Sequence, residues 1–198
     1  NLLQEVKELI SLKANVNIPC VELSVGVTGS TPLYTAALNG NLDIVTSLLE
    51  HGANYHYAKA HAENKGEDTC ELLLKQAWQD FIRQKLEITI KAIKESERCV
   101  DEVDVHGCTA LFHAAQLNLF QEVKELISLK ASVNISCVGL GIGVGDSTPL
   151  YAAALNRNLD IVTSLLEHGA NYHDARAHAE NKGEDTCELF LKQAWQNF

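Results

Sequence analysis

The stretch Ser147-Thr148-Pro149-Leu150-Tyr151-Ala152-Ala153-Ala154 opens the part of the sequence that decides the fold. Thr148 is suited to cap a helix, and Pro149 fits the first helical position, where no backbone N–H is needed. The alanines keep this helix thin, so a neighbour can pack closely against it. An apolar stripe in residues 159–166 predicts a second helix, and Gly169 stands where a left-handed residue is wanted to stop it. The stretch therefore predicts a pair of antiparallel helices that stacks on its neighbours.

The same pattern occurs earlier in the chain. Residues 30–54 run from Ser30-Thr31-Pro32-Leu33-Tyr34 to Gly52-Ala53-Asn54 and are a twin of residues 147–171. Residues 104–134 carry a third version, which runs from Asp104-Val105-His106-Gly107-Cys108-Thr109 to Ser132-Val133-Asn134. A short unit of two helices thus recurs along the chain, as in a solenoid protein.

A longer period contains the short one. Residues 1–81 recur as residues 118–198, an offset of 117 residues, with 14 differences and no insertion or deletion. Five of the differences fall within residues 22–29. Because both ends of the sequence fall inside this long unit, we expect the natural protein to carry further copies.

These segments resemble ankyrin repeats, which combine a β-turn, a Thr-Pro-Leu-His helix start, two antiparallel helices and a Gly-Ala close. Tyr34, Phe112 and Tyr151 stand where that family has its histidine. Lys13 and Lys130 replace the glycine that stops the second helix. The family's capping hydrogen bonds are therefore not expected to carry over unchanged at these positions, although the stack itself is.

The resemblance implies an all-α fold, an ankyrin-type helical solenoid with β-hairpin fingers. We expect one continuous solenoid over residues 1–198, containing lengthened fingers and a degenerate helical repeat. In the degenerate region, residues 60–66 and 70–74 are expected to form two short helices, and residues 84–96 a further one with Leu86, Ile90 and Ile93 on one face. The predicted divisions are a partial ankyrin repeat (1–19), an extended finger (20–28), an ankyrin repeat (29–57), degenerate helical repeats (58–103), an ankyrin repeat (104–136), an extended finger (137–145), an ankyrin repeat (146–174) and the start of a degenerate repeat (175–198).

Composition narrows the function classes. With 46% hydrophobic and 21% charged residues, the chain has the composition of an ordinary globular protein. Its formal net charge of -10 disfavours a nucleic-acid partner, and no apolar run is long enough to insert into a membrane. The six cysteines form no C-x-x-C pair, so we expect free thiols in a reducing, cytoplasmic or other intracellular compartment. That compartment would be a host cell if the protein is a delivered effector.

No motif in the sequence is organised for catalysis or cofactor binding. The glycine-rich residues 139–146 do not directly follow a strand and open a helix, as a dinucleotide loop must. His61, Glu63 and Cys70 match part of a zinc-deaminase signature but lack its P-C-x-x-C segment. The sequence thus predicts a non-enzyme with no cofactor, no metal and no small-molecule substrate. Trp78 and its twin Trp195 are interpreted as buried aromatic residues that seal the degenerate repeat, with an exposed binding anchor as the alternative.

The resemblance implies recognition of a protein partner through the finger tips and the exposed face of the first helices. Alternating apolar residues in both long fingers predict apolar side chains that a partner, another copy or the adjacent finger must cover. Three functions stay open: a protein-binding scaffold, a self-associating array or fibre, and the repeat region of a larger effector or toxin. The predicted contact residues are Glu22, Leu23, Val25, Val27, Leu38, Asn39, Val105, His106, Gln116, Leu117, Leu140, Ile142, Val144, Asp146, Leu155 and Asn156.

Overall fold

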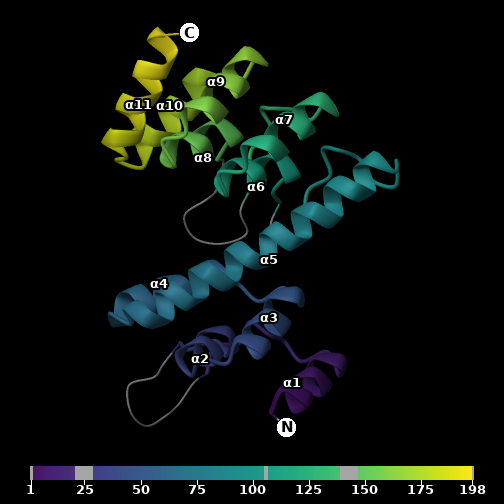
Figure 1. The fold of residues 1–198 in the computed structure, drawn as a ribbon. Helices are drawn as coiled ribbons and strands as arrows, with labels where there is room; N and C mark the ends of the chain where they lie inside the picture. The colour runs from purple at the N-terminus through teal and green to yellow at the C-terminus, as the bar shows by residue number, and fades with distance from the viewer. Residues whose placement is uncertain (1, 21–28, 105–106, 139–146, 198) are drawn as a thin grey trace. The chain divides into compact units, whose positions relative to one another are not determined.

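The computed structural model describes residues 2–20, 29–104, 107–138 and 147–197. These residues form eleven helices (Figure 1) and divide into two compact units, Asn1–Arg83 and Gln84–Phe198. Among the described residues, no helix combines the length and apolar character needed to cross a membrane. The helices are α1 (Leu2–Ser11), α2 (Pro32–Leu38), α3 (Leu42–Glu50), α4 (Tyr55–Lys65), α5 (Asp68–Lys94), α6 (Ala110–Gln116), α7 (Phe120–Ser128), α8 (Pro149–Leu155), α9 (Leu159–Glu167), α10 (Tyr172–Asn181) and α11 (Asp185–Gln196).

Threonine caps start the first helix of each repeat. Thr31, Thr109 and Thr148 have extended backbones, and each Oγ1 accepts a hydrogen bond from the N–H three residues later, at 3.2–3.3 Å. This confirms the starts predicted at Thr31 and Thr148. Pro32 and Pro149 occupy the first helical positions, where their missing N–H costs no hydrogen bond.

Left-handed residues stop the second helix of each repeat. Gly52 and Gly169 have φ values of 82° and 84°, as their positions in the sequence predict. Lys13 and Lys130 adopt the same conformation, with φ values of 64° and 69°. The closing hydrogen bond forms in spite of the lysine: the N–H of Ala131 donates to the carbonyl of Leu126 at 3.0 Å. The turn geometry is kept, and each lysine bears the steric cost that glycine avoids.

The region that the sequence divides into short helices is built differently. Residues 70–74 and 84–96 do not form separate helices, because α5 runs without a break from Asp68 to Lys94. No glycine or proline interrupts this segment, so nothing in the backbone ends the helix. Its apolar residues are buried in turn: Leu74, Trp78 and Ile82 in the first unit, and Leu86, Ile90 and Ile93 in the core of the second.

Single antiparallel bridges mark the bases of the predicted fingers. Cys20 pairs with Ser30, Cys137 with Ser147, and Val103 with Thr109. Residues 21–28 and 139–146 of the two long fingers, and the tip of the third at 105–106, lie outside the described residues. The structure therefore gives the bases of the fingers and leaves their lengthened β-structure a prediction.

An asparagine side chain joins consecutive repeats in both units. In the second unit, Asn134 Nδ2 donates to the carbonyl of Gly169 at 3.0 Å, and the N–H of Asn171 donates to Asn134 Oδ1 at 2.8 Å. In the first unit, Asn17 makes the same two bonds to Gly52 and Asn54, at 3.0 and 2.7 Å. We call this two-bond contact the asparagine clasp. It fixes the register of one repeat relative to the next along their helix axes.

Replacing Lys130 with glycine should stabilise the second unit. Glycine has no Cβ, so it relieves the left-handed strain, and the net gain in free energy of unfolding should be about 0.5–1 kcal/mol. Chemical denaturation followed by the fluorescence of Trp195 in a Trp78→Phe background measures this unit.

The matched control is Gly169→Lys, which should lose a similar free energy. A Cβ built at Gly169 meets nothing within 4 Å, so its cost lies in the backbone alone. A Lys130→Gly protein no more stable than its parent would contradict the account of this turn.

Candidate protein-interaction surface

Only part of the predicted contact surface can be placed. Ten of its residues lie outside the described residues: Glu22, Leu23, Val25, Val27, Val105, His106, Leu140, Ile142, Val144 and Asp146. The others lie at the C-terminal ends of α2, α6 and α8. The structure thus locates only the predicted contact residues that belong to helix ends.

Two of the placed positions are apolar and open to solvent. Leu38, which ends α2, is 46% exposed, and its twin Leu155, which ends α8, is 45% exposed. Gln116 and Leu117 at the end of α6 are half-buried. Leu38 and Leu155 therefore remain the strongest contact candidates among the predicted residues.

The predicted asparagines have structural partners. Asn156 Nδ2 donates to the carbonyls of Ala115 and Gln116, at 3.3 and 2.8 Å, and so ties α8 to the end of α6. Asn39 Nδ2 donates within its own helix to Thr35. Asn156 thus contributes to stacking, which its position in the sequence did not reveal.

Sequence reasoning missed a second pair of exposed leucines. Leu42, which begins α3, is 55% exposed, and its twin Leu159, which begins α9, is 52% exposed. In each unit a three-residue turn separates the two leucines, and its middle residue, Gly40 or Arg157, has a positive φ. We call Leu38 with Leu42, and likewise Leu155 with Leu159, the leucine edge of its unit. Comparison of the two copies could have identified these leucines as contact residues. All four are identical between the copies, whereas the turn between them differs at Gly40 and Arg157.

The first unit also has an apolar groove. Its volume is about 360 Å3, and its lining includes Val6, Ile18, Pro32, Ala36 and Ile44. In the second copy the equivalent face of α8 packs against α6, and the residues that correspond to Val6, Pro32, Ala36 and Ile44 are buried. The groove is thus a stacking face of the repeat rather than a pocket built for a small molecule.

Aromatic packing accounts for the histidines and tryptophans. His61 packs edge-on against Tyr34 with ring centroids 4.5 Å apart, and His178 packs against Tyr151 in the same way. A tyrosine–histidine contact thus forms where the family places a histidine at the helix start.

The two tryptophans stack on tyrosines in matching positions. Trp78 stacks on Tyr55 and is 5% exposed, which confirms that it is buried. Trp195 stacks on Tyr172 in the same way but is 42% exposed, so the interpretation of it as a buried residue is wrong. Phe81 covers Trp78 at 5.8 Å, whereas its twin, Phe198, lies outside the described residues.

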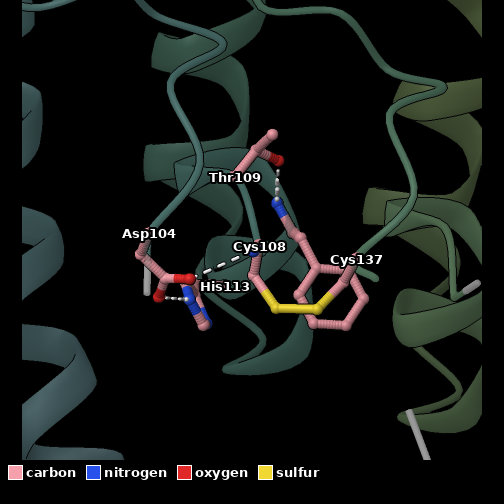
Figure 2. Close-up of polar contacts among 6 residues, drawn as sticks. Asp104, Cys108, Thr109, His113 and Cys137 are labelled. Carbon is pink, nitrogen blue, oxygen red and sulfur yellow. Dashed lines mark hydrogen bonds and ion pairs between the residues drawn. A yellow bond between two sulfur atoms is a disulfide. The ribbon is translucent and has the colours of Figure 1, made fainter. Parts of the chain in front are cut away.

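The expectation of six free thiols is wrong for one pair. Cys108, just before α6, and Cys137, at the base of the next finger, form a disulfide (Figure 2) with Cα atoms 4.3 Å apart. The N–H of Val138 donates to the carbonyl of Gly107 and so holds the two segments side by side. The pair was missed because its residues are 29 positions apart and meet only when two repeats stack.

An aspartate and a histidine lie next to this pair. Asp104 Oδ1 accepts the N–H of Cys108 at 3.0 Å, and Asp104 Oδ2 lies 2.8 Å from His113 Nε2 (Figure 2). His113 comes from the second turn of α6 and is 7% exposed. The carboxylate therefore holds both the finger turn and the imidazole ring.

The other four cysteines are free and fall into two classes. Cys20 and Cys99 are exposed, whereas Cys70 and Cys187 are buried. Burial, and then the charge of Glu184, raise the pKa of Cys187 to about 11. Burial and the charge of Glu67 raise the pKa of Cys70. Both buried thiols are thus kept protonated and poorly nucleophilic near neutral pH.

Comparison with known proteins agrees with this architecture. A family model for ankyrin repeats in three copies matches residues 56–176, and a single ankyrin repeat matches residues 28–60. The chain belongs to the ankyrin-repeat family. Its helix pairs are ankyrin repeats, and ankyrin repeats are protein-interaction modules.

The curated relatives are larger proteins that contain ankyrin regions. The chain is 29% identical over 181 residues to a palmitoyltransferase, AKR1, of Lachancea kluyveri, a match covering 91% of the chain and 22% of the relative. It is 35% identical over 101 residues to the inactive serine/threonine-protein kinase TEX14 of Bos taurus, covering 51% and 6%. The match to the ankyrin repeat and KH domain-containing protein mask-1 of Caenorhabditis elegans is 28% over 181 residues, covering 84% and 6%. The chain therefore spans less than a quarter of each relative.

The ankyrin stack should divide the six cysteines into three reactivity classes. In the native, unreduced protein, iodoacetamide should modify Cys20 and Cys99 quickly, since both are exposed, and Cys70 and Cys187 slowly. Cys108 and Cys137 should react only after reduction, with a mass gain of about 2 Da for the opened disulfide. Peptide mass spectrometry of a labelling time course measures all six rates. Rapid labelling of Cys108 without reductant would show that the pair is not bonded.

Proposed function

We propose that this chain is a non-catalytic scaffold whose ankyrin repeats bind a protein partner along the leucine edge and the adjoining fingers. The observation that carries the proposal is the matched exposure of the two leucine edges. Four large apolar side chains stand in water at the same positions of both copies. A group of exposed apolar residues, unlike a scattered single one, marks an interaction surface.

The surroundings of the leucine edge fit protein recognition. The turns carry Asn39 and Asn41 in the first unit and Asn156 and Asn158 in the second, with Gly40 or the charged Arg157 between them. An apolar centre with polar amides around it is the usual composition of a protein interface. The net charge of -10 further favours a protein over a nucleic acid.

The fingers are the second half of the proposed surface. Leu23, Val25 and Val27 alternate in one finger, as Leu140, Ile142 and Val144 do in the other. Alternation puts these side chains on one face of an extended strand. A partner, a second copy or the adjacent finger would then cover that face.

Two further functions stay open. Nearly identical units of 117 residues could pair through their fingers and build a self-associating array or fibre. The chain could also be the repeat region of a larger effector, toxin or enzyme. The similarity to a palmitoyltransferase supports a larger enzyme context without assigning catalysis to these residues. In either setting the repeats supply binding, because no set of side chains in the sequence matches a catalytic motif.

Removing the leucine edge should abolish peptide recognition without unfolding the protein. Peptides selected from a phage-displayed random library on the wild-type chain are the probe, with affinities measured by fluorescence polarisation. The variant Leu38→Ser, Leu42→Ser, Leu155→Ser, Leu159→Ser should lose at least tenfold in affinity. Its melting temperature should hardly change, since each side chain is about half exposed.

The matched control replaces two exposed leucines elsewhere, Leu72 on α5 and Leu189 on α11, with serine. If control and edge variants bind equally well, the leucine edge is not the contact surface. Light scattering tests the self-associating array. A molar mass of the wild-type chain that rises with concentration, and that no longer rises in the variant Leu140→Ser, Ile142→Ser, Val144→Ser, would favour self-association.

A further inference from the structure

The cluster beside α6 holds the donor types that bind zinc. Asp104 offers a carboxylate, Cys108 a sulfur and His113 an imidazole nitrogen, and one ligand atom of each lies within 4.8 Å of the other two. Cys137 adds a second sulfur, bonded to that of Cys108 (Figure 2). Thiolate, imidazole and carboxylate are the ligands of tetrahedral zinc sites in proteins.

The distances are close to those that a metal ion needs. Typical Zn–S, Zn–N and Zn–O bonds in a tetrahedron place the ligand atoms about 3.3–3.8 Å from one another. The Asp104–His113 contact of 2.8 Å would open slightly, and the Cys108 sulfur would come closer to the other two ligand atoms by about 1.5 Å at most. The two sulfurs, bonded to each other in the disulfide, would move apart to about 3.8 Å after reduction. Side-chain rotation alone can supply movements of this size, since both backbone segments are already in place.

The imidazole is incompletely satisfied as it stands. His113 is 7% exposed, and its Nδ1 is buried with no hydrogen-bond partner among the described residues. A buried polar atom without a partner costs about 1–3 kcal/mol. A metal ion in the cluster would let the ring rotate and use one nitrogen as a ligand while the other keeps a hydrogen bond, as metal-bound histidines do.

The ankyrin fold does not require these residues. At the positions equivalent to Cys108 and His113, the repeat at 146–174 carries Ser147 and Ala152, and both are buried in the same stack. A serine and an alanine therefore satisfy the packing there. The cysteine and the histidine occur together in one repeat, and the cysteine is bonded to Cys137.

We propose that this cluster is a redox-linked zinc site with four ligands: Asp104, Cys108, His113 and Cys137. A thiol or phosphine reductant first converts the disulfide to two thiols. Zn2+ then displaces the two thiol protons and binds both thiolates. A disulfide oxidant such as oxidised glutathione takes the two electrons back, re-forms the disulfide and releases the ion. Since Cys108 and Cys137 belong to consecutive repeats, either state ties the two repeats together.

The test is a cobalt titration of the whole chain, reduced with a phosphine under argon. One equivalent of Co2+ should give thiolate-to-cobalt charge-transfer bands and the d–d bands of tetrahedral cobalt, and Zn2+ should remove both. Cys108→Ser should abolish the charge-transfer bands or reduce them by about half, and His113→Ala should weaken binding by about tenfold or more. The control Cys20→Ser changes the twin of Cys137 and should bind as the parent does.

A second variant keeps the test decisive if Cys108→Ser unfolds the repeat. His113→Cys supplies a third thiolate, so it should retain tetrahedral cobalt with stronger charge-transfer bands. Circular dichroism of each variant reports whether the helices persist. Cobalt spectra without thiolate bands in the reduced parent, or bands that survive Cys108→Ser unchanged, would overturn the proposal and leave Asp104 as a clamp of the finger turn only.

Discussion

The structure depends on one constraint: a pair of short helices cannot bury its apolar residues without a neighbouring pair. The first helices show this most clearly. In α8, which packs against α6 and α10, every residue from Pro149 to Ala154 is buried. In its twin α2, Pro32 and Thr35 are exposed, and an apolar groove lies alongside. The two helices differ in sequence at one position, Thr35 in α2 and Ala152 in α8, so the exposure of the proline that both share follows from the neighbour rather than from the sequence of the helix.

The asparagine clasp converts this need for a neighbour into a fixed register. Apolar packing is tolerant of small shifts, whereas two hydrogen bonds from one amide are not. Asn17 and Asn134 each bind two backbone groups of the next repeat. One is the carbonyl of the glycine that follows its second helix, and the other is the N–H of the asparagine that caps the helix after it. In the second unit, the cysteine pair provides a further tie between the same two repeats that Asn134 joins, at the base of the finger. The finger bases and helix ends of successive repeats are thus set at a defined spacing within each unit.

Sequence reasoning was reliable where a feature is local. The threonine caps and glycine stops were predicted because they depend on a few adjacent residues. The positive φ of Lys130 was not, since the packing of the helices outweighs a local preference of about 1–2 kcal/mol. The unbroken α5 was missed because its weakly periodic sequence was interpreted as several helices, although no residue in it stops one. The Cys108–Cys137 pair forms only when two repeats stack, and the Asp104–His113 contact forms only when the finger turn folds. Neither can be inferred from the spacing of these residues along the chain. For the interaction surface, the sequence indicated Leu38 and Leu155 but not that Leu42 and Leu159, four residues further along the chain, are exposed as well.

The most direct test of this account is to add a neighbouring helix to the first unit. A chain with a second copy of residues 101–117 joined ahead of Asn1 continues the 117-residue register and offers the α2 groove a helix like α6. The account predicts that this segment becomes protected from hydrogen exchange and that the first unit, followed by Trp78 in a Trp195→Phe background, unfolds at higher denaturant. The same segment with serine at its positions equivalent to Leu111 and Phe112 should do neither. A segment that exchanges freely and leaves the unfolding midpoint unchanged would contradict the claim that neighbouring repeats, rather than the helix pair alone, stabilise the fold.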